Sequence, residues 1–312
     1  MDKSAYNEYM FDAITLGTVS VDLFFRDDSL TFHDNRFQLS VGGKYQALYF
    51  HTSVGGGAAN IAIHIQRQGL QAAVMGKIGE NPFKRIILDS FEKESVFYKY
   101  CHYEKDYYNI SSILLTPTGE RTVIHHQTPH QHLFESEKEM KRLRRAKAVY
   151  VGTIPDGSLS IREEILAYLK QHDVLSIVNL GIRDCRRNEH ALKTILNRAR
   201  IIIVNGHEFA EIVKAPYQDI DFTEHVVDYY IPYLKDQLVI ITEGERGSYA
   251  YYAGHVIHQK AIKPNKIVDT TGAGDAYCAG FIASYLQTND IQSAMKNGAE
   301  LSSKVLSKVG AT

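Results

Sequence analysis

Residues 269–286 read DTTGAGDAYCAGFIASYL and join a turn of small residues to a helix whose spacing of Ala and Gly suits close packing. Gly272, Ala273 and Gly274 leave backbone N–H groups uncovered at the positive end of this helix, which is what an anion site requires. Asp275 follows directly. Its carboxylate would repel a phosphate, but it can accept a proton from a hydroxyl that attacks phosphorus. The alternative is that Asp275 only caps the helix.

Another glycine-rich turn, residues 54–60 (VGGGAAN), lies earlier in the chain and also leads into a helix. In chain order, it is the first glycine-rich turn and the turn at 272–274 is the second. Residues without side chains let a ligand approach the backbone, and Asn60 offers donors and an acceptor to a polyhydroxylated ligand. Neither turn matches GxxxxGK[ST], and no GxGxxG precedes a helix in the first βαβ unit, which argues against P-loop enzymes and nicotinamide dehydrogenases. The presence of both turns favours Asp275 as a proton acceptor over a plain helix cap.

Short β-branched runs alternate with longer periodic segments along most of the chain, which is typical of βαβ units around a mostly parallel sheet flanked by helices. Several runs are almost entirely apolar, as expected for strands that are covered on both faces. We predict core strands over 13–16, 72–75, 148–151, 175–179, 201–205 and 238–242. We predict helices over 60–68, 83–94, 137–145, 159–171, 189–199 and 208–213.

Two regions, about 22–53 and 98–127, lack this alternation and contain strand-like segments with little helix character. We predict that they form one small antiparallel sheet, with a turn at Thr118-Gly119. Such a sheet cannot bury both of its faces alone, so it should cover a site as a lid or pair with a second copy of the chain. The expected organisation is therefore a single domain, residues 1–312, that carries this lid.

The overall composition narrows the classes of partner. The chain has 312 residues with 35 Lys+Arg, 36 Asp+Glu and a net charge of −1, so it lacks the basic character of a general nucleic-acid binder. Its longest apolar runs are far shorter than the roughly 20 residues of a membrane-spanning helix, and the N-terminus shows no signal-peptide pattern. The three cysteines form no CxxC pair. We therefore predict a cytoplasmic protein that binds neither nucleic acid nor membranes.

Residues 55–79 and 269–282 resemble, in spacing and order, the two signature patterns of the ribokinase-like sugar kinase family, also called the PfkB family. Further landmarks of that family occur between them in the expected order, so the resemblance covers essentially the whole chain. It implies a three-layer ribokinase-like α/β fold with a small β-sheet lid. It also implies transfer of the γ-phosphoryl group of ATP to a hydroxymethyl group of a sugar or sugar-like acceptor, with Mg²⁺ and, in many members, K⁺.

The resemblance also assigns roles to single residues. Substrate hydroxyls would be bound by Asp22, Gly56, Asn60 and Asp275, and Asp275 would be the base. Gly272, Ala273 and Gly274 would form the anion hole. The residues expected along the nucleotide are Asn205, Thr242, Gly244, Gly247 and Gly274.

Glu208, in the NGHE stretch, matches the family's NxxE motif and would place Mg²⁺ through water. This agrees with the preference of Mg²⁺ for oxygen ligands and retained water. Each of these residues also has a structural explanation. Glu208 could be a solvated residue at a helix start, Asp22 a turn cap, and the glycines of TEGERG ordinary turn residues.

One departure from the family pattern bears on the acceptor. Gly57 stands where ribokinases usually have lysine in GGKGAN, which argues against ribose and against a sugar phosphate. A nucleoside kinase is therefore an alternative. A catalytically idle ligand-binding member of the fold is a second, although the retained Asp275 speaks against it. Arg183, in NLGIR, could contact an acidic sugar or form a surface salt bridge.

Histidines cluster between His125 and His132. The stretch from Thr128 to His132 reads as a loop without paired ligands elsewhere, so we do not expect a metal site there. A contact between substrate and the strand around His125 and His126 is the preferred interpretation, because the lid should cover the sugar. The lid could also pair two subunits into a homodimer.

Overall fold

The computed structural model describes residues 10–34, 36–117, 120–129, 136–154 and 159–312. Its central element is an eight-stranded sheet, and all six predicted core strands belong to it. Six strands run parallel and the last two are antiparallel. In spatial order they are β6 (Ala72–Met75), β1 (Phe11–Leu16), β11 (Ala146–Val151), β12 (Leu175–Val178), β13 (Ile201–Asn205), β14 (Leu238–Thr242), β15 (Ser248–Tyr252) and β16 (His255–Gln259).

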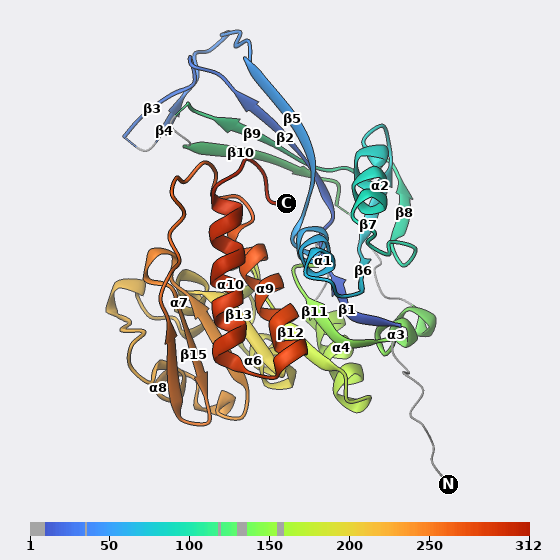
Figure 1. The fold of residues 1–312 in the computed structure, drawn as a ribbon, viewed down its shortest axis with the longest axis vertical. Coiled ribbons are helices and arrows are strands. Elements are labelled where there is room, and N and C mark those ends of the chain that lie inside the picture. The colour runs from blue at the N-terminus through green and yellow to red at the C-terminus, as the bar shows by residue number, and fades with distance from the viewer. Residues whose placement is uncertain (1–9, 35, 118–119, 130–135, 155–158) are drawn as a thin grey trace.

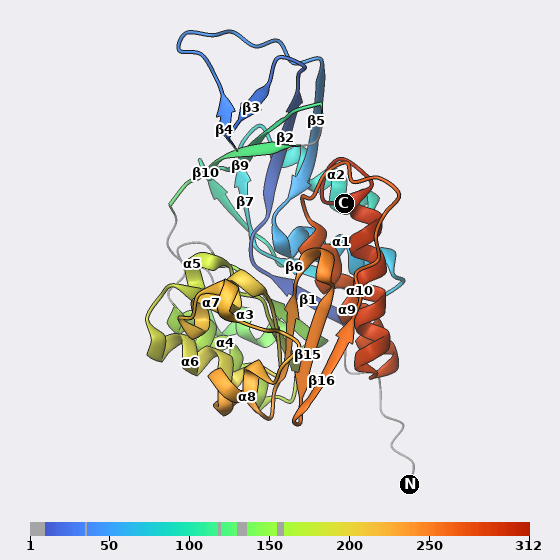
Figure 2. The ribbon, with the colours of Figure 1, turned by 90° about the vertical axis from the view of Figure 1, so that its left-hand side faces the viewer.

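Helices cover both faces of this sheet, so the body has three layers (Figure 2). Alternate residues of β13 point into two different cores: Ile202 and Val204 pack on one side, Ile201 and Ile203 on the other. This is why the parallel strands read as continuous apolar runs. One layer contains α3 (Glu137–Leu143), α4 (Leu159–Gln171), α6 (Glu189–Arg198), α7 (Gly206–Val213) and α8 (Val226–Tyr230). The other contains α1 (Gly57–Arg67), α2 (Lys84–Lys93), α9 (Ala273–Thr288) and α10 (Ile291–Leu306).

The pairing of α9 with α10 was not predicted from the sequence. The two helices approach closely because Gly280 on α9 faces the backbone of α10: a Cβ at Gly280 would lie 2.8 Å from the Asn297 carbonyl oxygen and 3.0 Å from the Gly298 Cα. The small residues noted in the 269–286 stretch therefore do serve close packing. This contact fixes the helix that begins at the second glycine-rich turn.

A second sheet stands above the body (Figure 1) and joins the two predicted insertions. Its strand order is β10 (Arg121–Gln127), β9 (Asn109–Leu115), β2 (Ser20–Arg26) and β5 (Tyr49–Gly55). We call these four strands the lid sheet. The prediction of an antiparallel sheet was wrong in one respect: β2 and β9 are parallel, because they come from different insertions that enter from the same end.

Part of the predicted insertions lies outside the lid sheet. β3 (Thr31–His33) and β4 (Arg36–Gln38) form a separate hairpin. β8 (His102–Lys105) pairs in parallel with β7 (Lys77–Glu80). The Thr118-Gly119 turn and the histidines at 130 and 132 lie outside the described residues.

The short elements complete the path of the chain. After β12 comes α5 (Ile182–Cys185), and three 3₁₀ turns follow at η1 (Tyr217–Asp219), η2 (Pro232–Leu234) and η3 (Gly244–Arg246). The turns that follow β1, β12, β13 and β14 lie at the carboxyl edge of the parallel strands, where open α/β sheets bind ligands. None of the helices described is both long and apolar enough to cross a membrane.

Candidate active site

The two glycine-rich turns meet at Asp275. This residue lies in the first turn of α9, and Asn60 lies in the first turn of α1, which packs against α9. Asn60 Nδ2 donates a hydrogen bond of 2.8 Å to Asp275 Oδ2. Burial raises the pKa of Asp275, and the bond from Asn60 partly opposes that rise. A raised pKa makes this carboxylate a stronger proton acceptor than an ordinary aspartate.

The first turn is shaped by close contacts with the protein itself. A Cβ at Gly55 would overlap the carboxylate of Asp22. Gly56 has φ of +91°, and a Cβ there would lie 2.5 Å from the Thr18 carbonyl oxygen. A Cβ at Gly57 would lie 3.4 Å from Asp275 Oδ1, which places this turn against the candidate base.

Asp22 lies in the middle of β2, on the lid sheet, and is only 6% exposed. Burial raises its pKa to about 6, although hydrogen bonds with Ser111 and Ser20 act in the opposite direction. The negative charges of Asp275 and Asp269 raise the pKa further. The structure therefore brings Asp22 and Asp275 close enough for their charges to interact, as the assignment of both to one substrate site requires.

The two glycines of the second turn, Gly272 and Gly274, have different surroundings. Gly272 has φ of +75°, and a Cβ there would overlap the Cβ of Ala311 near the C-terminus. A Cβ at Gly274 would meet nothing within 4 Å. Gly274 and Ala273 instead line an open cavity of about 150 Å³. The N-terminal end of α9 thus has free space beside its unpaired N–H groups.

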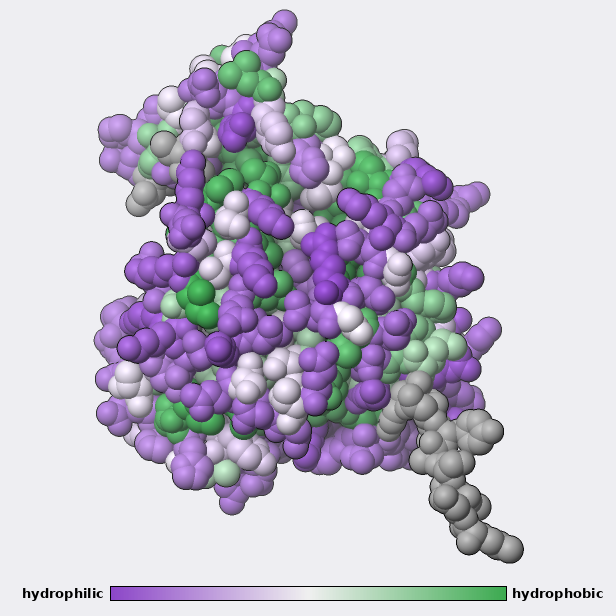
Figure 3. Space-filling view, viewed as in Figure 1, coloured by the Kyte–Doolittle hydropathy of each residue, from purple (hydrophilic) through white to green (hydrophobic). Residues whose placement is uncertain are grey.

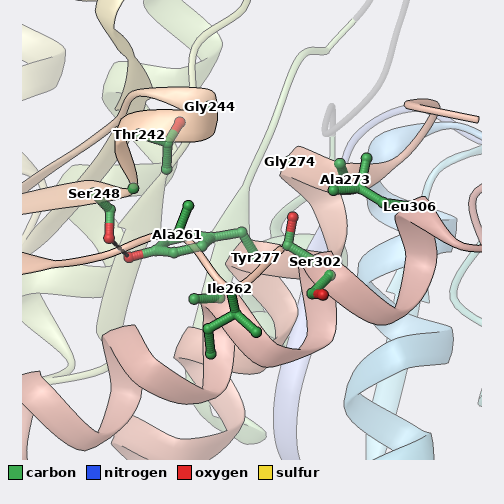
Figure 4. A pocket seen from close by; sticks show the side chains of 13 residues that line it. Thr242, Gly244, Ser248, Ala261, Ile262, Ala273, Gly274, Tyr277, Ser302 and Leu306 are labelled. Atoms are coloured by element: carbon green, nitrogen blue, oxygen red, sulfur yellow. Dashed lines mark hydrogen bonds between the residues drawn. The ribbon is translucent and has the colours of Figure 1, made fainter. Parts of the chain in front are cut away.

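Both apolar and polar side chains line this cavity (Figure 4). Ile262, Ala299 and Leu306 contribute apolar side chains, and the hydroxyl of Tyr277 donates to Ser248 Oγ at 2.7 Å. Four of the five residues predicted along the nucleotide line it: Thr242, Gly244, Gly247 and Gly274. The cavity therefore lies at the residues predicted to bind the nucleotide.

Asn205 and Glu208 begin α7 and do not line that cavity. They form a capping box: Asn205 Oδ1 accepts from the Glu208 N–H, and Glu208 Oε2 accepts from the Asn205 N–H, both at 2.9 Å. This local role alone accounts for their spacing. Burial nevertheless raises the pKa of Glu208 to about 7, so its carboxylate would gain from a nearby cation. No group of three or more metal-ligating side chains occurs in the described part of the chain.

The segment after α10 is a part of the site that the sequence did not indicate. Ala311 is buried, and its carbonyl oxygen lies 2.7 Å from His64 Nε2 on α1. The Gly310 N–H donates to Asp269 Oδ2 at 3.0 Å, and Arg121 of the lid sheet contacts Asp269 Oδ1 at 3.3 Å. This segment thus ties α1, the second turn and the lid sheet together. Its short polar sequence carries no periodic signal that could have revealed it.

Comparison with known proteins gives the class of this protein: a phosphotransferase that acts on an alcohol group. A model described as pfkB family carbohydrate kinase matches residues 10–312. The chain belongs to that family.

Individual similarities agree with this assignment. The 5-dehydro-2-deoxygluconokinase of Bacillus subtilis is 27% identical over 98% of this chain and 93% of its own length. The structure of Arabidopsis thaliana ribokinase complexed with ribose and ATP superposes with a TM-score of 0.79 at 19% identity, covering 96% of this chain and 94% of that one. Burkholderia thailandensis nucleoside kinase in complex with inosine gives a TM-score of 0.74 at 19% identity, covering 96% and 92%.

Proposed function

We propose that this protein is an ATP-dependent kinase that phosphorylates a hydroxymethyl group of a sugar or sugar-like acceptor. The observation that carries the proposal is the position of Asp275. It directly follows Gly274, which lines the proposed nucleotide cavity, it lies against the first turn through Asn60 and Gly57, and its charge acts on Asp22. A proton acceptor is needed at that junction, where an acceptor hydroxyl meets the terminal phosphoryl group.

In the proposed reaction, Asp22 accepts hydrogen bonds from acceptor hydroxyls and orients the ring or chain. Asp275 takes the proton of the hydroxymethyl group as its oxygen attacks the γ-phosphorus. The bond from that phosphorus to the bridging oxygen of ADP breaks. The backbone N–H groups of Gly272, Ala273 and Gly274 stabilise the charge on the transferred phosphoryl group. Asn60 holds Asp275 in the orientation seen in the structure.

The residues present fit a divalent cation held mainly by phosphate and water. Glu208 supplies one carboxylate with a raised pKa, and we infer that it orients water around Mg²⁺. Bound Mg²⁺ would neutralise part of the phosphate charge. We also propose that K⁺ activates the enzyme, on the ground of the family resemblance alone.

The substitution Asp275→Asn tests the proposal. We expect phosphoryl transfer to fall about 10²- to 10⁴-fold, because an amide cannot take the proton, while circular dichroism and thermal unfolding stay near wild type. Asp290→Asn is the matched control. Asp290 also begins a helix, where it caps α10 by accepting from the Ser293 N–H, so this variant tests helix capping alone. Near wild-type transfer in Asp275→Asn would show that the base is misassigned.

A nucleoside acceptor is the second candidate, favoured by the structural likeness to a nucleoside kinase that binds inosine. Product formation from ATP should be measured with a panel of sugars, sugar acids and nucleosides. Turnover confined to nucleosides would replace the sugar proposal. Tight ligand binding without any turnover would favour the idle ligand-binding alternative.

We further propose that the outer face of the lid sheet pairs with a second copy of the chain. Phe50 and Ile124 on that face are 57% and 62% exposed, and hydrophobic residues are visible around the lid sheet in Figure 3. Sedimentation of the wild type should give a dimer and Ile124→Glu a monomer; a monomeric wild type would refute the pairing. We also propose a cytoplasmic location, consistent with three free, buried cysteines.

A further inference from the structure

The carboxylate of Asp269 is a junction between the second turn, the segment after α10 and the lid sheet. Its side chain is completely buried. Oδ1 accepts from the N–H and the hydroxyl of Thr271, at 2.9 and 2.7 Å. Oδ2 accepts from the Gly310 N–H at 3.0 Å. The carboxylate therefore fixes the backbone immediately before Gly272, the residue that caps α9.

Arg121, the first residue of β10, brings a positive charge to this junction from the lid sheet. It lies directly opposite Leu115 on β9, so both side chains point to the same face. Leu115 belongs to a small apolar cluster against which Val309, after α10, packs, and this face is therefore turned toward the body. Arg121 Nη1 lies 3.3 Å from Asp269 Oδ1 and also donates to Thr270 Oγ1. One guanidinium of the lid sheet thus contacts two successive residues just before the second turn.

The segment after α10 makes a different kind of contact with the lid sheet. A Cβ at Gly310 would lie 3.9 Å from Ser53 Oγ and 3.9 Å from Phe24 Cζ. Ser53 lies opposite Asp22, and Phe24 is two residues beyond Asp22 on the same face. Ser53 Oγ has no hydrogen-bond partner among the described residues, so this contact is one of packing. Arg121, in contrast, gives a charged and directed contact.

The contact between Arg121 and Asp269 differs from an ordinary surface salt bridge. An exposed ion pair is worth little, because both charges are hydrated and both side chains are mobile. Here the carboxylate is buried and held by backbone N–H groups, and the arginine side chain is only 31% exposed. A charge-assisted hydrogen bond is roughly twice as strong as a neutral one and depends on direction. A shift of the lid sheet would therefore either break this bond or move the turn.

We propose that Arg121 is a positioning residue that couples the lid sheet to the second turn through Asp269. A nucleotide phosphate that fixes the N–H groups of the turn would, through Arg121, hold the lid sheet and Asp22 over the acceptor. An acceptor bound at Asp22 would hold the turn through the same contact, because coupling between two binding sites is reciprocal. This inference rests on the proposed kinase function and adds a connection between its two sites.

The first test needs only a nucleotide. Amide hydrogen exchange in β9 and β10 is measured with and without Mg²⁺ and the non-hydrolysable analogue adenylyl imidodiphosphate, in wild type, Arg121→Gln and Arg121→Lys. The matched control is Arg26→Gln. Arg26 is also an exposed arginine of the lid sheet, but its guanidinium lies over the Tyr49 ring of the neighbouring strand, 5.0 Å from the centroid.

We expect the analogue to slow exchange in these strands about 10-fold in wild type and in Arg26→Gln, the size of a typical coupling between sites. In Arg121→Gln the analogue should bind with nearly wild-type affinity by calorimetry, but exchange should slow less than about twofold. Arg121→Lys keeps the charge as a single ammonium group, so it should retain part of the effect. If Arg121→Gln does not fold, this intermediate value for Arg121→Lys carries the test.

The second test measures the coupling from the acceptor side. The probe is the compound of the sugar and nucleoside panel that the wild type phosphorylates with the highest kcat/KM. Saturating analogue should raise its affinity about 10-fold in wild type and less than about twofold in Arg121→Gln. Its affinity without nucleotide should be the same in both proteins. A merely structural role for Arg121 would instead lower the affinity measured without nucleotide.

The outcomes separate this inference from the proposed function. If the analogue binds wild type without slowing exchange in β9 and β10, the inference is overturned and the kinase proposal stands. Slower exchange that persists fully in Arg121→Gln also overturns it, because the lid sheet would then be coupled through the segment after α10. An equal loss in Arg26→Gln overturns it as well. Failure of the wild type to bind the analogue would overturn the nucleotide site of the proposed function itself.

Discussion

The two glycine-rich turns look alike in sequence but differ in what surrounds them. Around the first turn, the space that a side chain would need is taken by the protein: by Asp22 at Gly55 and by the Thr18 backbone at Gly56. In the second turn, Gly272 is enclosed in the same way by Ala311, but beside Gly274 the space is empty. Glycine in the first turn thus leaves room for the Asp22 carboxylate and the Thr18 backbone. At Gly274 it leaves room for a ligand.

This difference between the turns should separate an effect on folding from an effect on the reaction, although the two usually change together. A larger residue in the first turn should disturb both folding and acceptor binding, because the displaced group is Asp22, the proposed substrate ligand. A larger residue at Gly274 should leave folding intact and disturb only the reaction. The predictions below test this distinction, from the largest expected effect to the smallest.

Gly55→Ala should have the largest effect. The added methyl would overlap the Asp22 carboxylate, so we expect a loss of about 1–3 kcal/mol in the free energy of unfolding. We also expect a fall of about 10²-fold or more in kcat/KM, since a displacement near 1 Å at a substrate ligand can cost that much. Denaturant unfolding and initial rates measure the two effects. In an Asp22→Ala background the stability loss should largely disappear; if it persists, the overlap with Asp22 is not its cause.

Gly274→Ala should affect the reaction alone. The residue lies in α9 with no atom in the way of a methyl group, so stability should stay equal or rise by about 0.4–1 kcal/mol. The methyl would occupy the space next to the anion turn, and kcat/KM should fall about 10²-fold, comparable to the loss of one stabilising donor. Thermal unfolding and steady-state rates measured on the same preparation suffice. If this variant is less stable than wild type, the space beside Gly274 is not empty.

Lowering the pH should weaken acceptor binding by protonating Asp22, which lies beside the first turn. The pKa of Asp22 is raised to about 6, so between pH 7 and pH 5 its ionised fraction, and with it the acceptor affinity, should fall about tenfold. Stability should respond in the opposite direction: a pKa raised on folding gives a contribution that is present near pH 4 and is lost as pH rises through about 6.

The measurement is acceptor affinity without nucleotide, by calorimetry at several pH values. Asp22→Asn should flatten the dependence between pH 5 and pH 7. An unchanged pH profile in this variant would assign the titration to another group.

His64→Leu should have the smallest effect on the reaction. It removes the donor to the Ala311 carbonyl oxygen, which leaves that buried oxygen unpaired at a cost of about 1–3 kcal/mol. Because Ala311 packs on Gly272, kcat should fall several-fold with little change in the acceptor KM. His64→Gln, which can still donate, should restore most of both losses. If glutamine and leucine behave alike, the hydrogen bond does not hold the segment.

Much of the fold was predictable because its signals are local. The six parallel strands, the two turns and the predicted helices are each set by apolar periodicity and turn residues within one segment; these helices are α1, α2, α3, α4, α6, α7 and α9. The misassigned feature, the direction of β2 against β9, depends on how two distant insertions enter the same sheet. α10 was not predicted because Gly298 and Ser303 on its packed face weaken the apolar pattern of the segment.

The sequence by itself determined which groups could carry the chemistry: an anion-binding turn, an aspartate beside it, and a second turn with Asn60. Only the tertiary structure decided their partners. Asn60 and Asp275 are separated by 215 residues, and the lid sheet joins strands from both insertions. The physical reason is that turn chemistry depends on neighbouring residues. A raised pKa or a buried unpaired oxygen depends on which surfaces the packed chain brings together.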